Sequence, residues 1–482
     1  MRAAIAAESA GIPSVSIVCD GFASQANATA RGLGFDGLPL AVTIGHVDTQ
    51  NAEEMTANFI GETVEVIIEG LTNADEPTNS TNHEPSAVDI VFSGSIDEVN
   101  ERFVAKGWSD GSPIIPPTKD RVETYLAGSG HDPWKTLGIA PASGRDLTVW
   151  SIGVNAVMAG CRPEHLPVLL AITEILADPN YGAEHSGNTT GADALVVLDG
   201  PNSAALGFNC GPGAQREGTQ ANTSVGRWLR LYLRNVLGFT ASEHDKATFG
   251  NPTRPVLATD HSVTTELGWP TVGQQAAHLS LPGSDPGSDR LTNLGAANEV
   301  VSMVRMNSGI LIGSVFGSTP NEIIPNLANG LTRAAGWDLT HVYGLGHNQY
   351  APLLVISPLI ARTLARAGVS FVDLRAALFK HARIPAASFE RFIGEWSNLT
   401  AGRPTLSQLV ADGHLPEVFA TSDDPHRLVP IVPTPDRLLI AIAGDPNRAN
   451  AYAFSNDGPH GWWTFKTIDH TPASDLICNV PQ

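Results

Sequence analysis

The stretch from residue 13 to residue 45, PSVSIVCDGFASQANATARGLGFDGLPLAVTIG, decides the fold class of the N-terminal region. Two short apolar runs rich in β-branched residues, PSVSIVC (13–19) and LPLAVTIG (38–45), predict strands. The runs that predict helices are AAIAAES (3–9), FASQANATARGL (22–33) and NAEEMTANFIGETVEVIIEGL (51–71). This order of helices and strands predicts an α/β unit with parallel strands covered by helices.

Length and charge narrow the class of protein. A chain of 482 residues predicts two or three domains. The net charge of −20 repels phosphate backbones and anionic lipids, so nucleic acids and membrane surfaces are excluded as expected partners. The sequence contains no run of about 20 apolar residues that would span a bilayer, and its first residues do not resemble a signal peptide. We therefore expect a cytoplasmic protein with reduced thiols.

The chain divides at a polar segment. Residues 72–87, TNADEPTNSTNHEPSA, contain almost no apolar side chains and predict a linker. We expect a small α/β domain over residues 1–71, a large α/β domain over 88–345 and a C-terminal α/β subdomain over 346–482. Apolar strands alternate with helices after the linker, so we expect at least one mostly parallel sheet.

Three sequence patterns resemble a known group of bacterial proteins. GIPSVSIVCDGFASQANATARGLG (11–34), followed by LPLAVTIGHV (38–47), is similar to the domain of the UGSC family of selenoproteins and their cysteine homologues. RFVAKGWSDGSPIIPPTKDRVETYL (102–126) and NAVMAGCRPEHLPVLLAITEIL (155–176) resemble a larger domain associated with the same group. The resemblance implies thiol or redox chemistry on a small molecule.

This sequence departs from the family at the motif that gives the family its name. That thiol or selenol motif would precede AAIAAESAGIP, and the sequence starts at Met1 without it. We therefore expect that the redox role of the motif does not carry over to this chain. Either a separate subunit carries the motif, or this chain has replaced that chemistry.

Cys19 and His46 form the first candidate site. Both follow predicted strands, and parallel strands end at the same edge of a sheet, where ligands bind in α/β proteins. A neighbouring imidazole can lower the pKa of a thiol and generate the nucleophilic thiolate. The alternative is that Cys19 packs as a small apolar residue, and that Asp20 caps the following helix.

A glycine-rich loop forms the second candidate site. LGFNCGPGAQREGTQANTSVGRWLRL (206–231) follows an apolar strand and leads into a helix. Its backbone N–H groups can converge on an anion, with Cys210 as nucleophile and Arg216 or Arg227 as the positive charge. The other predicted substrate-binding residues of this site are Asn209, Gly211, Gly213 and Asn222. The alternative is a connector whose arginines face solvent.

The histidines predict no metal site. The 15 histidines include His185, His261, His278, His341 and His347 on expected loops, but no HExxH motif and no zinc-type spacing occurs. We expect no metal from a local motif, while a site gathered from histidines on distant loops stays an open alternative, and no motif implies a cofactor. His165 and Cys161 are expected to lie in a packed core, and Trp462 and Trp463 to cover a core edge.

Three functions remain open at this point. The first is an enzyme of small-molecule metabolism that uses Cys210 or Cys19 in thiol-dependent chemistry on a small organic acid or sulfur-containing compound. The second is a cofactor-independent hydrolase or lyase in which polar loops polarise a carbonyl group. The third is a non-catalytic subunit that scaffolds a separate redox protein. Two strands are too few for a stable sheet, so we also expect a homo-oligomer.

Overall fold

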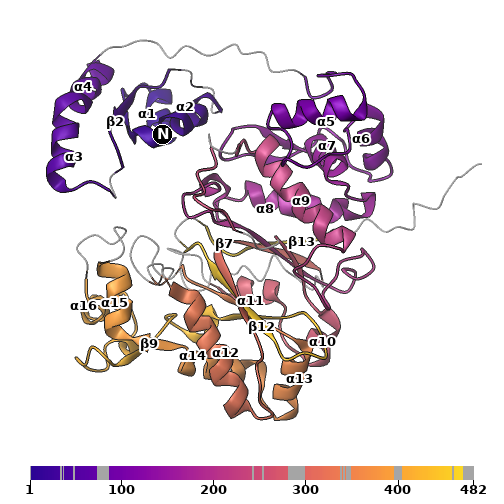
Figure 1. The fold of residues 1–482 in the computed structure, drawn as a ribbon, viewed down its shortest axis with the longest axis vertical. Helices are drawn as coiled ribbons and strands as arrows, with labels where there is room; N and C mark the ends of the chain where they lie inside the picture. Colours follow the sequence, from indigo (N-terminus) through magenta and orange to yellow (C-terminus); the bar gives the residue numbers. More distant parts are fainter. Residues whose placement is uncertain are drawn as a thin grey trace, which may run out of the picture.

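The chain is an α/β protein (Figure 1). The computed structural model describes residues 2–32, 35, 37–46, 49–72, 86–240, 244–251, 255–279, 299–336, 339, 342, 349–395, 404–458 and 461–469. Most of the predicted linker, residues 73–85, lies outside the described residues, as do His341, His347 and Cys478.

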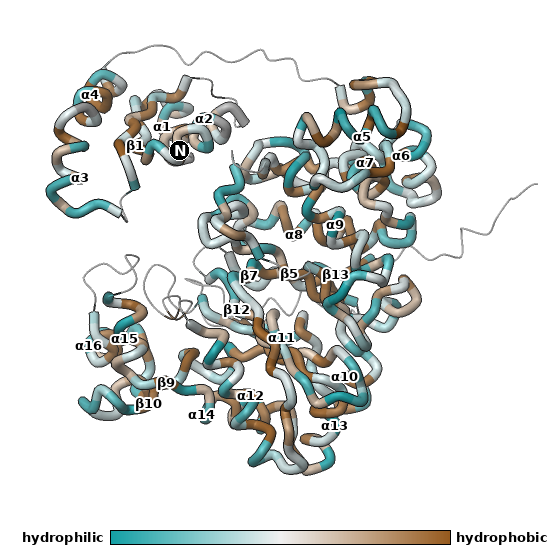
Figure 2. Tube along the Cα trace, viewed as in Figure 1, coloured by the Kyte–Doolittle hydropathy of each residue, from teal (hydrophilic) through white to brown (hydrophobic). Residues whose placement is uncertain are grey.

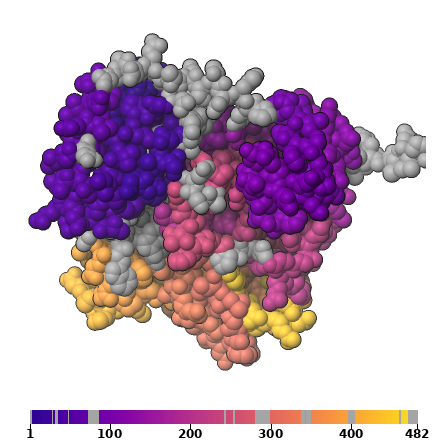
Figure 3. All heavy atoms as spheres, turned by 45° about the horizontal axis from the view of Figure 1, so that its top comes forward, coloured from indigo at the N-terminus to yellow at the C-terminus, as the bar shows by residue number. Residues whose placement is uncertain are grey.

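Residues 2–72 form the predicted small α/β unit. Its elements are α1 (Arg2–Ser9), β1 (Ser16–Cys19), α2 (Ala23–Gly32), β2 (Leu40–Thr43), α3 (Ala52–Asn58), a π-helical segment (Phe59–Thr63) and α4 (Val64–Thr72). The two strands pair in parallel, with Ser16 opposite Leu40 and Cys19 opposite Thr43. The parallel pairing expected from the sequence is therefore confirmed, and Figure 3 shows this unit as a lobe of its own on the molecular surface.

One mixed sheet dominates the larger region. It contains seven strands in the order β11-β8-β12-β7-β5-β6, with β13 also paired to β7. These strands are β5 (Asp193–Asp199), β6 (Val256–Ala258), β7 (Val300–Ile312), β8 (Leu353–Ile356), β11 (Leu439–Ile442), β12 (Ala451–Asn456) and β13 (Thr464–Thr467). Strands β5 to β7 precede the domain boundary predicted between residues 345 and 346, and the other four strands follow it. The predicted boundary therefore divides strands that belong to one sheet.

The expectation of a mostly parallel sheet in the larger region was wrong. Only the pairs β5–β6 and β8–β11 are parallel, and β7 is antiparallel to β5, β12 and β13. An apolar run indicates that both faces of a strand are covered, but it does not reveal the direction of the neighbouring strand. Helices cover both faces of this sheet, so its antiparallel centre has the composition of a parallel one.

Alternate residues of the strands enter different cores. On the inner face, Leu195, Val197, Val355 and Phe454 pack with α11 (Val272–His278). On the outer face, β5, β6 and the start of β7 pack against α7 (Val149–Ala159), α8 (Leu166–Ala177) and α9 (Gln220–Asn235). The outer face of β8, β11 and β12 packs against α12 (Pro320–Ala335), α13 (Pro358–Arg366) and α14 (Phe371–His381). Figure 2 shows the hydrophobic residues gathered along these strands and helices.

Smaller elements surround the sheet. They are α5 (Ile96–Ala105), α6 (Lys119–Leu126), β3 (Thr136–Ile139), β4 (Asp146–Thr148), α10 (His261–Glu266), β9 (Arg383–Pro385), α15 (Ala386–Gly394), α16 (Leu406–Ala411) and β10 (Leu428–Pro430). A capping box of Ser95 and Glu98 starts α5, as the sequence predicts. Cys161, His165, Trp462 and Trp463 are all buried, as expected.

The sheet curls until its two edge strands meet at their carboxyl ends. The backbone N–H of Asp260, just after β6, donates to the carbonyl of Ile442 at the end of β11 over 2.7 Å. Within β11, Ile440 is hydrogen-bonded to the side chain of Gln275. The Gln275 nitrogen donates to the Ile440 carbonyl at 2.7 Å, and the Gln275 oxygen accepts from the Ile440 N–H at 2.8 Å. Helix α11 thus supplies, through one side chain, the partners that an adjacent strand would give this edge.

We predict that Gln275→Leu lowers the free energy of unfolding by about 2 to 4 kcal/mol, because it leaves two buried backbone groups of Ile440 without partners. Denaturant unfolding of the purified chain measures this change. The matched control is Gln408→Leu at an exposed position of α16, where we expect a change within about 0.5 kcal/mol. Equal unfolding free energies for the two variants would show that Gln275 does not protect the edge.

Candidate functional site

A pocket opens where the strand ends converge. It has a volume of about 160 Å³ and lies between the glycine-rich loop, the end of β8 and the turn between β11 and β12. Its lining residues are Ala214, Gln215, Leu257, Leu311, Val355, Ser357, Ala443, Gly444, Asp445, Arg448, Asn450, Ala451 and Tyr452. We call this cavity the Arg448 pocket. Ligand sites in α/β proteins commonly lie at such strand ends.

Backbone hydrogen bonds hold the walls of the pocket together. The N–H of Gly444 donates to the carbonyl of Cys210 over 2.7 Å, which fixes the glycine-rich loop to the end of β11. The N–H of Ser357 donates to the carbonyl of Asn450 over 3.1 Å, which joins the start of α13 to the turn before β12. Segments that are far apart in the sequence are thereby fixed around one cavity.

A strained residue is hydrogen-bonded to Asn450, one of the lining residues. Ser314 has a φ of 55°, in the left-handed region that favours glycine. Its N–H donates to the side-chain oxygen of Asn450 over 2.8 Å. Non-glycine residues in this region persist only where neighbouring contacts impose the conformation, and they cluster at functional sites.

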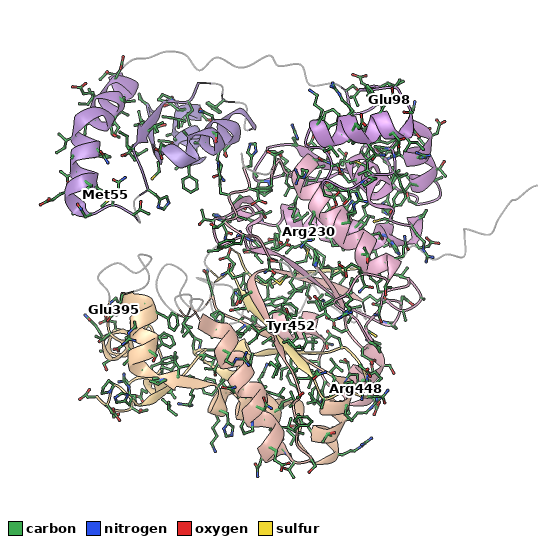
Figure 4. The ribbon with its side chains drawn as sticks, viewed as in Figure 1. Met55, Glu98, Arg230, Glu395, Arg448 and Tyr452 are labelled. Atoms are coloured by element: carbon green, nitrogen blue, oxygen red, sulfur yellow. The ribbon has the colours of Figure 1, made fainter. Side chains whose placement is uncertain are left out.

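Tyr452 lies against Gly309 on the neighbouring strand β7. A Cβ atom at position 309 would lie 2.5 Å from Cε1 of the Tyr452 ring, so the absence of a side chain there leaves room for the ring. The ring also contacts that of Phe454, at 4.7 Å between centroids. Figure 4 places Tyr452 near the middle of the sheet and Arg448 toward the end near α10 and α13.

Three rim side chains supply most of the chemistry. Arg448 is exposed, and Asp445 accepts a hydrogen bond from the N–H of Asn447 at 2.8 Å. The side-chain oxygen of Gln215 is buried and has no hydrogen-bond partner among the described residues, while its nitrogen donates to the carbonyl of Val256 at 3.4 Å. The pocket therefore offers one cation and one carboxylate above an apolar floor, and Gln215 forms part of its wall.

The sequence-predicted glycine-rich site is only partly assembled. The side-chain oxygen of Asn222 accepts from the N–H of Asn209 at 2.8 Å, and its nitrogen donates to the carbonyl of Asn209 at 3.1 Å. Asn209 also accepts from the N–H of Gly211 at 2.9 Å. These amides hold the loop in shape. Helix α9 begins at Gln220, so Asn222 lies in its first turn and is buried there.

The two predicted arginines do not line the Arg448 pocket. Arg216 is exposed beside Gly213, whose φ of 75° suits a glycine turn. Arg227 donates to both carboxylate oxygens of Asp110, each at 2.9 Å, and to the carbonyl of Pro113 at 2.8 Å. Arg227 thereby fastens α9 to the proline-rich turn that precedes α6.

Cys210 has the character of a neutral thiol. Burial and, secondly, the nearby Asp260 carboxylate raise the pKa of the Cys210 thiol. Its carbonyl accepts the hydrogen bond from Gly444, but its side chain packs against the core around α7 to α9. In Cys161, burial raises the thiol pKa to about 12. Neither environment favours a thiolate.

Cys19 and His46 lie at the same edge of the small sheet. Cys19 ends β1 opposite Thr43, and His46 follows β2 by three residues. The His46 ring contacts the ring of Phe22, with 5.6 Å between centroids. The carboxylate of Asp20 accepts from the adjacent N–H of Gly21 at 2.6 Å, within a 3₁₀ turn before α2, so it does not cap α2 as expected.

Asp199, the last residue of β5, has a buried side chain. Its carboxylate accepts from the hydroxyl of Thr259, just after β6, at 2.7 Å and from the N–H of Gly273 at 3.1 Å. Burial raises the pKa of the Asp199 carboxyl to about 6, against the lowering effects of these hydrogen bonds and of nearby His261. The group borders a cavity of about 10 Å³, lined also by Thr259 and Trp269.

Among the described residues, no group of three or more His, Cys, Asp or Glu side chains is arranged to hold a metal ion. None of the described helices combines the length and the apolar character needed to cross a membrane.

The comparison with known proteins concerns the small unit. The sequence model of the UGSC family matches residues 1–73. The resemblance stated from the sequence is thus supported for the unit that carries Cys19 and His46, and the match ends before the larger region. No curated protein and no solved structure matches the chain.

Sequence reasoning missed Arg448, Asp445 and Tyr452. Arg448 lies in the turn DPNRAN (445–450), which has the composition of an ordinary polar loop. The only available signal was that the apolar strand RLLIAIA (437–443) ends in Gly-Asp, the position at which ligand-binding loops begin in α/β sheets.

We predict that Asp199→Asn removes part of the pH dependence of stability between about pH 4 and pH 6. The folded-state pKa of about 6 exceeds the unfolded value of about 3.9. The folded chain therefore holds more protons in this window, and its free energy of unfolding falls by roughly 2 to 3 kcal/mol as the pH rises. Denaturant unfolding at several pH values should give a flatter profile for Asp199→Asn, whereas exposed Asp412→Asn should keep the wild-type profile. A wild-type slope in Asp199→Asn would refute this assignment.

Proposed function

We propose that the chain is an enzyme of small-molecule metabolism that binds a small organic acid in the Arg448 pocket. The observation that carries this proposal is the convergence of polar side chains from three separate segments above an apolar floor. Arg448 and Asp445 come from the turn after β11, Ser357 from the end of β8 and Gln215 from the glycine-rich loop. This combination of an apolar cavity and a few convergent polar groups is typical of small-molecule sites.

Acid–base chemistry fits the lining of this pocket better than thiol chemistry does. Asp445 and Tyr452 carry groups that can hold or move a proton, and the Arg448 guanidinium can stabilise negative charge that develops on a substrate oxygen. The pocket is not lined by a cysteine, and the raised pKa keeps the Cys210 thiol protonated at neutral pH. A cofactor-independent hydrolase or lyase is therefore the function that these residues support best.

Thiol-dependent chemistry is the second candidate, and it belongs to the small unit. The UGSC match covers Cys19 and His46, and Cys19 is free and only partly buried. This arrangement supports either a reactive thiol in the chain itself or a scaffold for a separate subunit that carries a thiol or selenol motif. It does not depend on the Arg448 pocket.

We predict that a library of small organic acids contains a ligand that raises the melting temperature of the wild-type chain by a few degrees, because binding to the folded state stabilises it. Arg448→Gln should abolish this shift, whereas Arg333→Gln on an exposed surface of α12 should retain it. Thermal unfolding followed by fluorescence measures both effects.

The same assay separates the two candidates. Cys19→Ser and Cys210→Ser should keep the ligand shift if the pocket acts without a thiol. A shift that survives in Arg448→Gln but disappears in Cys19→Ser would overturn the pocket proposal in favour of thiol chemistry. If no library member shifts the wild-type chain, the proposal that this pocket binds a small organic acid fails.

We also propose that the protein is cytoplasmic and forms a homo-oligomer through the small unit. Val42 in β2 and Ile44 just after this strand lie two residues apart, and their side chains are 42% and 58% exposed, while Ile17, on the other face of the sheet, is 53% exposed. Clustered exposed apolar residues commonly mark an interaction surface, and strand edges pair readily with other strands.

Light scattering at micromolar concentration should give the mass of a dimer or larger oligomer for the wild-type chain. Val42→Lys places a charge on the sheet face beside exposed Ile44 and should yield the monomer mass, while Val372→Lys on exposed α14 should leave the oligomer intact. A monomeric wild-type chain would contradict this assembly. Co-purification of a small partner instead would favour the scaffold function.

A further inference from the structure

Resting on the proposed small-molecule site, we infer that the ligand of the Arg448 pocket is a short aliphatic amino acid in its zwitterionic form. Three features of the cavity indicate this ligand: the charges of its rim, its apolar floor and its size.

The charged side chains at the rim of the pocket favour a ligand that carries one positive and one negative charge. Among the lining residues, Arg448 carries a positive charge and Asp445 a negative one. The Arg448 side chain makes no ion pair or hydrogen bond with any residue in the described part of the chain, so its guanidinium is available to a carboxylate. The Asp445 carboxylate, which accepts only one backbone N–H, retains lone pairs for an ammonium group.

The net charge of the protein also favours a zwitterionic ligand over an anionic one. At a net charge of −20 the chain repels a dianionic ligand, whereas a zwitterion has no net charge to repel. A rim with one charge of each sign also leaves no excess charge once a zwitterion is bound.

An ammonium group suits the negative side of the rim. It carries three N–H donors, so it can donate to the free lone pairs of the Asp445 carboxylate.

The apolar floor and the volume of the pocket indicate the polarity and the size of the ligand's side chain. Leu257, Val355 and Ala443 belong to the inner apolar core and line the pocket. A cavity of about 150 Å³ accommodates a benzene-sized molecule, so the 160 Å³ of this pocket suits about six to nine non-hydrogen atoms. Valine meets each of these requirements.

The test is isothermal titration calorimetry of the full chain with L-valine, the hydroxy acid analogue of valine, and isobutylamine. We expect L-valine to bind, and the two analogues to bind at least roughly tenfold more weakly, because each lacks one charged group. Arg448→Gln and Asp445→Asn should each weaken L-valine binding by roughly tenfold. Arg333→Gln should bind L-valine as the wild-type chain does.

Asp445→Asn is the sharpest variant, because it should weaken L-valine binding but leave the hydroxy acid analogue unaffected. Equal binding of L-valine and its hydroxy acid analogue, or no binding of L-valine, would overturn the amino acid inference. If another small organic acid then binds in an Arg448-dependent manner, the proposed function survives this failure. If no ligand depends on Arg448, both proposals fail.

Discussion

The buried ion pair between Arg305 and Asp457 fixes the centre of the large sheet. Nη2 of Arg305 lies 2.6 Å from a carboxylate oxygen of Asp457, and both side chains are 1% exposed. Asp457 also accepts from the side-chain nitrogen of Asn188 at 2.9 Å, and Arg305 donates to the carbonyl of Gly182 at 3.1 Å. The free-energy cost of desolvating two charges is offset only when the charged groups also form additional hydrogen bonds. The hydrogen bonds with Asn188 and Gly182 therefore help to stabilise the buried ion pair.

The ion pair lies at the middle of the large sheet, where the two halves of the sheet join along β7. Residues Val300 to Met306 of β7 pair with β5, and residues Met306 to Ile312 pair with β12. Arg305 lies where these partners change, and Asp457 directly follows β12. The two halves of the sheet then share one pattern, in which a parallel pair, β5–β6 or β8–β11, flanks an antiparallel centre. The carboxyl ends of β6 and β11 meet at the hydrogen bond between Asp260 and Ile442, and residues 443–445, just after β11, line the Arg448 pocket.

Local patterns predicted local structure well. The order of elements in residues 2–72, the capping box at Ser95 and the apolar strands followed from periodicity and cap residues, which act over a few positions. Strand direction did not, because an apolar strand covered on both faces looks the same in either direction. Arg227 was assigned to a binding loop although its partner, Asp110, is 117 residues away, and no local pattern encodes that pairing. The glycine-rich loop was singled out by composition, and its Ala214 and Gln215 do line the pocket.

The two candidate chemistries occupy different parts of the chain. Gln25 of the small unit donates to the carbonyl of His244 at 3.3 Å, so the unit contacts the larger region through a loop that lines no part of the Arg448 pocket. The pocket is built from residues 214–215, 257, 311, 355–357 and 443–452, all outside the UGSC match. Chemistry in the pocket can therefore proceed without a thiol from the small unit. Cys19 and His46, the residues of the thiol candidate, lie at the carboxyl edge of β1 and β2 in the small unit.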